Sequence, residues 1–261
     1  MVPNSWTFLA IKLVSVPIFI WMVSTVGRRW GHSIGGLILG LSLTSGPVLF
    51  FLSLEQGNLF ASAAALGTLM GLIPLATSCI AFSLLSFRAG WPTSLVACCI
   101  TFFAVAFILN YVSAPLLLSF VGVLAFLAII RKLFPSGTVE RVSRKTPSWE
   151  IPARAIAVTV LVLLITEGAT MLGPHLSGLL TPFPVYATIL GVFTPKFDGA
   201  NACALFLRGV ITGCFTTAVF LFLISSFIVP LGLFLVMTLA ILAVLLMHSL
   251  LLYTFRRSQL Q

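Results

Sequence analysis

Two polar interruptions within long apolar runs are the stretches of this sequence best suited to bind a solute. The first covers residues 41–47 and the second covers residues 178–184. Proline removes a backbone N–H donor and clashes with the preceding helical turn, so each interruption should free carbonyl groups beside hydroxyl side chains. Such groups near the middle of a membrane can hold a small solute or an ion. The substrate-binding residues predicted from these two stretches are Ser42, Thr44, Ser45, Pro47, Thr181 and Pro184.

Two charged residues inside apolar runs are further candidates for the same site. Glu167 precedes the second interruption, and Arg208 follows it. Charges within a membrane are costly and often functional, so Glu167 is predicted to act as a coupling carboxylate. Two structural alternatives stay open. Arginine can extend to the membrane surface from the depth of Arg208, and a proline kink can be patched by Ser and Thr hydroxyls without binding anything.

The sequence contains no recognisable catalytic constellation, and we expect that the protein is not an enzyme. The one aspartate, Asp198, falls in a predicted loop, whereas an intramembrane aspartyl protease needs two. Ser45 lacks the preceding glycine of a nucleophile elbow and a histidine to activate it. Neither a phosphate-binding glycine loop nor a metal-ligand spacing occurs, so we predict no metal and no cofactor. A lipid-handling enzyme with sparse motifs stays open as an alternative.

The composition indicates a helical membrane protein. Hydrophobic residues make up 60% of the chain and charged residues 7%, against about 25% charged residues in soluble domains. Apolar runs of bilayer length recur from end to end, and they are too long and too evenly apolar for barrel strands. The lipid bilayer is therefore the first predicted partner. The net charge of +9 resides in short loops, which is a topology signal and not a nucleic-acid surface.

The apolar runs predict an all-α polytopic protein with about nine transmembrane helices. Residues 1–130 form a first membrane unit with two extra helices, 131–152 a basic cytoplasmic linker, and 153–261 a second unit. The five cysteines all lie in apolar runs, and we interpret them as packing residues. The expected helices cover residues 6–26, 33–54, 59–87, 91–109, 114–130, 153–172, 176–194, 200–228 and 230–255.

An internal repeat relates the two units. An offset of 142 residues places five glycines on five glycines, and it also pairs Ala76 with Ala218 and Ser83 with Ser225. Five predicted helices separate the starts of the units, and an odd number inverts the second copy, as in many transporters. GxxxG pairs in both units are interpreted as helix-packing sites. The matched glycines are Gly31 with Gly173, Gly36 with Gly178, Gly57 with Gly199, Gly67 with Gly209, and Gly71 with Gly213.

The positions of the basic residues predict the orientation. An external N-terminus and a cytoplasmic C-terminus place every Lys- or Arg-bearing loop on the cytoplasmic side. The opposite loops, around Glu55, Asn110 and His175, carry neither residue type. The topology thus agrees with an odd number of helices.

Several motifs resemble those of a known group of proteins. The runs Arg29-Trp30-Gly31, Thr44-Ser45-Gly46-Pro47-Val48 and Glu55-Gln56-Gly57 are similar to a family of uncharacterised bacterial multi-pass inner-membrane proteins. The resemblance covers most of the chain and implies no activity. The run Leu180-Thr181-Pro182-Phe183-Pro184 and a later glycine turn resemble the small GlpM-type membrane proteins. Both resemblances imply a bacterial inner (cytoplasmic) membrane.

These observations favour a small transporter or permease. Its site is expected between the helices predicted at 33–54 and 176–194, and its substrate is an unidentified small solute or ion. The alternative is a non-transporting scaffold or assembly factor, whose glycine faces would bind helices of partner proteins. A homo-oligomer is compatible with either function.

Overall fold

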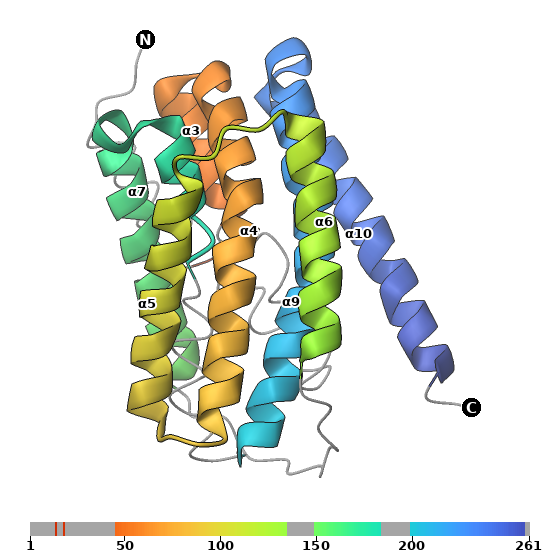
Figure 1. Ribbon diagram of the computed structural model, residues 1–261. Helices are drawn as coiled ribbons and strands as arrows, with labels where there is room; N and C mark the ends of the chain where they lie inside the picture. Colours follow the sequence, from red (N-terminus) through yellow and green to blue (C-terminus); the bar gives the residue numbers. More distant parts are fainter. Residues whose placement is uncertain (1–13, 15–17, 19–44, 135–148, 184–198, 259–261) are drawn as a thin grey trace.

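The computed structural model describes residues 14, 18, 45–134, 149–183 and 199–258, and it places them in a bundle of helices (Figure 1). No strand occurs within these ranges. The all-α prediction is therefore confirmed for the described part of the chain. The helices are α3 (Ser45–Gln56), α4 (Asn58–Ser86), α5 (Trp91–Leu109), α6 (Leu116–Leu133), α7 (Glu150–Leu180), α9 (Gly199–Leu231) and α10 (Leu233–Ser258).

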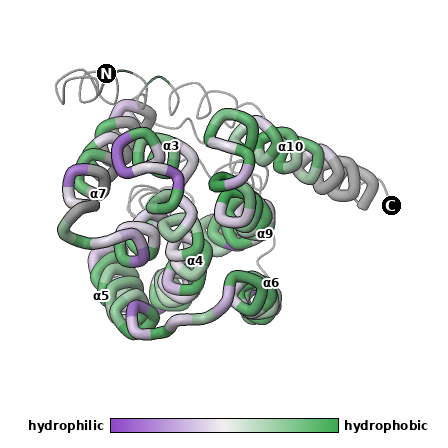
Figure 2. Tube along the Cα trace, turned by 90° about the horizontal axis from the view of Figure 1, so that it is seen from above, coloured by the Kyte–Doolittle hydropathy of each residue, from purple (hydrophilic) through white to green (hydrophobic). Residues whose placement is uncertain are grey.

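Helix α4 is the centre of the bundle. It packs against α3, α5, α6, α7 and α9, whereas α10 packs against α9. The view from above shows the other helices arranged around α4 (Figure 2). A tight turn at Gly57, with φ of +89°, reverses the chain between α3 and α4, and Ser53 Oγ donates a 2.6 Å hydrogen bond to Asn58 Oδ1 across it. Most of α4 is consequently buried.

Four helical segments in the described ranges are long and apolar enough to cross a membrane. They are Asn58–Ser86, Pro92–Leu109, Leu116–Leu133 and Leu207–Leu231, and a shorter apolar segment spans Leu233–Met247. Large hydrophobic side chains of α5, α6 and α10 are exposed on the outside of the bundle, as a lipid-facing surface requires. The prediction of a helical membrane protein agrees with these features.

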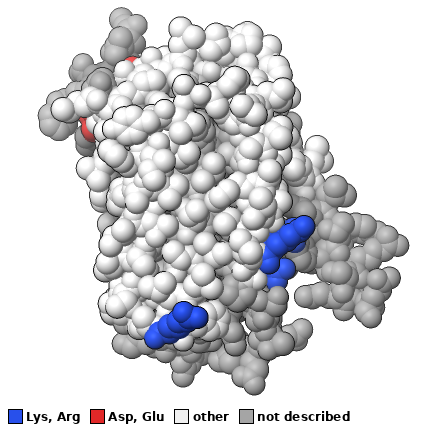
Figure 3. Space-filling model, in the orientation of Figure 1, with Lys and Arg blue, Asp and Glu red and all other residues white. Residues whose placement is uncertain are grey.

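Charged side chains are separated along the long axis of the bundle. On the face drawn in Figure 3, Lys and Arg lie in the lower half, while glutamates lie at the upper left. The last turn of α6 carries Arg131 and Lys132, and Arg88 follows the end of α4. The wide central band of this face carries neither sign of charge, which suits the apolar interior of a bilayer.

Helix α7 is two segments joined by a sharp reversal. Gly173 has φ of +73° and ψ of 168°, a conformation that L side chains rarely adopt, and Pro174 begins the second segment. The first segment ascends in Figure 1, and the second turns back down beside α4. The second segment ends at Leu180, and residues 181–183 are not helical. We call residues 174–180 the half-helix.

The predicted helix ends agree closely with the structure for α4, α5, α6, α9 and α10. The predicted linker is helical at both of its ends, because α6 continues through Lys132 and α7 begins at Glu150. Apart from residues 14 and 18, the helix predicted at 6–26 lies outside the described residues. Residues 33–44 of the next predicted helix and residues 184–194 also lie outside them. The nine-helix count and the repeat therefore remain predictions.

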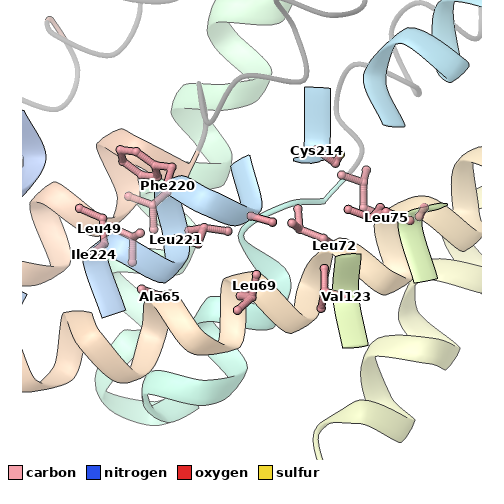
Figure 4. Close-up of a cluster of buried hydrophobic side chains, with 14 of the residues drawn as sticks. Leu49, Ala65, Leu69, Leu72, Leu75, Val123, Cys214, Phe220, Leu221 and Ile224 are labelled. Carbon is pink, nitrogen blue, oxygen red and sulfur yellow. The ribbon is translucent and has the colours of Figure 1, made fainter. Parts of the chain in front are cut away.

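The core is built from apolar side chains of α3, α4, α6 and α9. Figure 4 shows Leu49 of α3 near Leu221 and Ile224 of α9, and Leu72 and Leu75 of α4 near Val123 and Cys214. All five cysteines are free; four are buried and Cys99 is half-buried. Their environment is that of packing residues, as the sequence indicated.

Candidate functional site

The half-helix lies against the glycines of α4 at backbone-contact distance. A Cβ added at Gly71 would stand 2.7 Å from Leu179 O and 2.7 Å from Pro182 Cγ. At Gly67 it would overlap His175 O, and at Gly178 it would overlap Ala64 O. Successive contacts advance along both segments in the same direction, so the half-helix runs parallel to α4.

Because these positions carry no Cβ, their Cα–H groups point at carbonyl oxygens of the other segment. Gly67 and Gly71 face carbonyls of the half-helix, and Gly178 faces Ala64 O of α4. Weak Cα–H···O contacts of this kind recur at close helix crossings. The prediction that Gly67 and Gly71 serve helix packing is borne out by this contact. Gly209 and Gly213 have no comparable contact described.

The half-helix ends halfway along α4. Gly71 lies 13 residues after Asn58 and 15 before Ser86, which is about 20 Å from either end at 1.5 Å per residue. Leu179 and Pro182 are beside Gly71. The interruption in α7 is therefore at the middle depth of the longest central helix.

Hydroxyl and carbonyl groups gather at this interruption. Thr181 Oγ1 donates to Ser177 O at 2.8 Å, and Thr181 N donates to Gly178 O at 3.0 Å. Phe183 N donates to Leu180 O at 3.1 Å, while Pro182 has no N–H to offer. Both Ser177 and Thr181 are fully buried. Within the described ranges Ser177 Oγ has no hydrogen-bond partner, although buried hydroxyls usually have one.

Helix α5 covers the interruption on another side. Phe183 packs edge-on against Phe102, with ring centroids 5.2 Å apart, and its centroid is 5.6 Å from that of Phe103. Phe102 is fully buried, whereas Phe103 is about half exposed. The non-helical residues are thus held between α4 and α5, which shields their backbone from lipid.

The described part of α3 begins at a similar depth. Ser45 lies 11 residues before Gln56, or about 17 Å along the helix. An equal distance along α4 from Asn58 leads to Leu69, about half a turn short of the level of Gly71. Helices α3 and α7 contact each other, and Ser45 is buried. The first described residue of α3 and the end of the half-helix thus lie at about the same level.

The structure separates the predicted site residues into three groups. Ser45 is buried and Thr181 is fully buried, both at middle depth, and Pro47 is half-buried in the first turn of α3. Glu167 is exposed on α7, so its side chain does not share the buried surroundings of Thr181. Arg208 is half-buried nine residues into α9, and its carbonyl accepts a 2.9 Å bond from Thr212 Oγ1. Ser42, Thr44 and Pro184 lie outside the described residues.

Three residues around the interruption were not predicted as part of a site. Gly178 was noted as a repeat glycine and as the first residue of the second interruption, but it was not predicted as a site residue, although it makes the closest approach to α4. Ser177 and Phe183 lie close to the predicted residues Thr181 and Pro184, but nothing in the sequence indicated that they belong to the site. A buried hydroxyl next to a proline-containing break, with an aromatic residue after it, is the pattern that would have indicated them.

The described groups indicate which ligands this region suits. No group of three or more His, Cys, Asp or Glu side chains in the described ranges could hold a metal ion. The polar atoms at middle depth are hydroxyl oxygens and carbonyl oxygens, which suit a small polar solute or a weakly bound ion. No family model, curated protein or solved structure matches the chain, so the site has to be interpreted from its own geometry.

Proposed function

We propose that this integral membrane protein is a small transporter or permease whose site lies at the meeting of α3 and α7. The observation that carries the proposal is the half-helix that ends beside Gly71, at the middle depth of α4. Discontinuous helices whose ends meet near the midplane are the usual way in which transporters present backbone groups to a substrate. Lipid tolerates no such break, so the break must face protein or water.

The antiparallel arrangement of α4 and α9 supports the inverted repeat that accompanies this proposal. These two helices correspond at the 142-residue offset, and they run in opposite directions in Figure 1. Each of α5 and α6 is long enough to span the membrane, which favours an odd number of crossings between the units. The charge separation supports basic ends on the cytoplasmic side of a bacterial inner membrane, with the N-terminus outside.

The rival function is a scaffold or assembly factor that binds partner helices through its glycine faces. The contacts of the half-helix weigh against it for one of these faces. Gly67 and Gly71 are already covered by residues 175–182 of the same chain. A partner helix would have to displace the half-helix before it could use this face.

Water access to the interruption tests the proposal without knowledge of the substrate. In a variant whose five native cysteines are replaced by alanine, Thr181→Cys should react with a membrane-impermeant thiol reagent, since a transport cycle must open the site to water. Val123→Cys, which is buried between α6 and its neighbours, is the negative control. Asn110→Cys, in the exposed turn after α5, is the positive control.

Two outcomes separate the functions. Labelling of Thr181→Cys at a rate between those of the two controls supports a transporter. If Thr181→Cys is as unreactive as Val123→Cys on both sides of the membrane, the site is sealed and the transport proposal fails. Once a substrate is known, Ser45→Ala and Thr181→Ala should each reduce its uptake.

A further inference from the structure

The contact between α4 and α9 is fixed at one end by a reciprocal pair of hydrogen bonds. Ser62 Oγ donates to Ser225 O at 2.7 Å, and Ser225 Oγ donates to Ser62 O at 3.0 Å. Ser62 is near the start of α4 and Ser225 near the end of α9. We call this pair the serine latch and the α4–α9 contact the seam. Toward its other end, Cys79 of α4 and Cys203 of α9 are both almost fully buried.

Buried residues recur every seven positions along both helices of the seam, as in an antiparallel coiled coil. Starting from the latch, each step forward along α4 is opposite a step backward along α9. All six residues beyond the latch are fully buried. The register therefore gives four successive layers: Ser62 with Ser225, Leu69 with Ala218, Ala76 with Ile211, and Ser83 with Ala204.

These layers obey the repeat. The 142-residue offset carries Leu69 to Ile211 and Ala76 to Ala218. It therefore relates the two middle layers to each other, and each of them has a large residue opposite an alanine. The same offset carries Ser83 to Ser225 and Ser62 to Ala204. The two end layers are therefore equivalent except at one position, where the first has a serine and the last has an alanine.

The last layer has neither bond of the latch. Ser83 Oγ is fully buried and, in the described part of the chain, makes no hydrogen bond. Its counterpart Ser225 Oγ donates to the Ser62 carbonyl, whereas Ser83 Oγ does not donate to the Ala204 carbonyl, and Ala204 has no hydroxyl that could donate to the Ser83 carbonyl. An unpaired buried hydroxyl disfavours the closed contact, since opening lets water or another group bond to it.

We propose that the seam is an asymmetric gate, held shut at the serine latch and built to open at the Ser83–Ala204 end. This inference rests on the proposed transport function, because the opening end would admit solute toward the interruption beside Gly71. Opening one end of a pair of packed helices while the other stays fixed is a rocking motion, the type expected for inverted-repeat transporters.

Thiol reactivity at two equivalent positions tests the gate. Cys203 adjoins Ala204 at the unlatched end, and Ala61 is its counterpart at the 142-residue offset, beside Ser62. Both are almost fully buried, so a thiol at either position reacts only when its end of the seam opens. Each reporter is the single cysteine in the full-length protein in lipid vesicles, and N-ethylmaleimide is the probe. Cys203 should react faster than Ala61→Cys.

Changes to the latch and to the opposite layer should act on one reporter each. The double variant S62A/S225A removes both latch bonds and should speed labelling of Ala61→Cys about eightfold, as two bonds of about 0.6 kcal/mol each predict. Labelling of Cys203 should then change less than twofold. Ala204→Ser supplies a hydroxyl that can donate to the Ser83 carbonyl, as Ser62 does to the Ser225 carbonyl, and should slow labelling of Cys203 about threefold.

A second variant keeps the test valid if Ala204→Ser disturbs the packing of the seam. Ser83→Ala removes the unpaired hydroxyl, so it too should slow labelling of Cys203, whereas a packing defect would speed it. The gate is refuted if Ala61→Cys reacts as fast as Cys203, or if either substitution at this end speeds labelling of Cys203. Accessible Thr181→Cys with equal labelling at both ends rejects the gate alone, and sealed Thr181→Cys rejects the transport function.

Discussion

Replacing Gly178 by alanine should destabilise the protein more than the same change at Gly67 or Gly71. The three atoms nearest to the new Cβ all belong to the backbone of α4, so no side-chain rotation relieves the overlap. Thr68 N would be 2.8 Å away, whereas ordinary contact begins at 3.4 Å. The half-helix and α4 must therefore separate by at least about half an ångström.

The magnitude follows from what that separation breaks. It weakens the Cα–H···O contacts at Gly67, Gly71 and Gly178, each worth about 0.5–1 kcal/mol. Insertion of a methyl group into a packed contact costs about 1–3 kcal/mol. We expect a loss of about 3 kcal/mol. For a chain of this size that corresponds to a decrease in Tm of about 6–12 °C.

The buried cysteines provide the assay. A maleimide dye that fluoresces on reaction reports unfolding as Cys79, Cys98, Cys203 and Cys214 become exposed. Gly122→Ala on α6 is the matched control, since its Cβ would meet nothing within 4 Å and alanine favours helix by about 0.5–1 kcal/mol. A Tm for Gly178→Ala within about 2 °C of the parent protein would refute the close backbone contact.

Three further predictions follow from other features. Phe102→Ala should lower the free energy of unfolding by about 3–5 kcal/mol in the same melting assay, since it empties a buried site and removes the ring contact with Phe183; a Tm equal to that of the parent would contradict it. Gly232→Ala should cost about 1–2 kcal/mol although its surroundings are open, because φ of +81° strains an alanine; an unchanged melting curve would exclude that strain. Native Cys99 should react with N-ethylmaleimide before Cys79 does in timed labelling followed by peptide mass spectrometry, since it is half-buried and Cys79 fully buried; equal rates would indicate a loosely packed core.

The sequence predicted the class of fold well because membrane helices are specified locally. Apolar runs of bilayer length and the glycines and prolines that interrupt them determined most helix ends, including the break at Thr181. The reversal at Gly173 fell where a loop was expected between two helices. These features depend on neighbours in the chain, which a single sequence contains.

Contacts between distant segments could not be predicted in the same way. A GxxxG pair indicates a close helix crossing but does not identify the segment that packs against it. The contact between Gly67 and Gly178 could therefore be found only from the folded structure. The side on which a charged residue faces is another tertiary property. Glu167 was expected at an interior site, and the structure places its side chain on an exposed surface of α7. A rotation error of about half a turn in a sequence-based helix is enough to exchange these faces.

The half-helix also bears on how the chain is assembled during synthesis. Residues 174–180 are too few to cross a bilayer alone, and the non-helical backbone that follows them cannot remain in contact with lipid. Its shelter consists of α4 and α5, which leave the ribosome earlier. The helices that shelter the half-helix are therefore synthesised before it. Without α4 and α5, the half-helix and residues 181–183 would lack the protein contacts that shield their backbone from lipid.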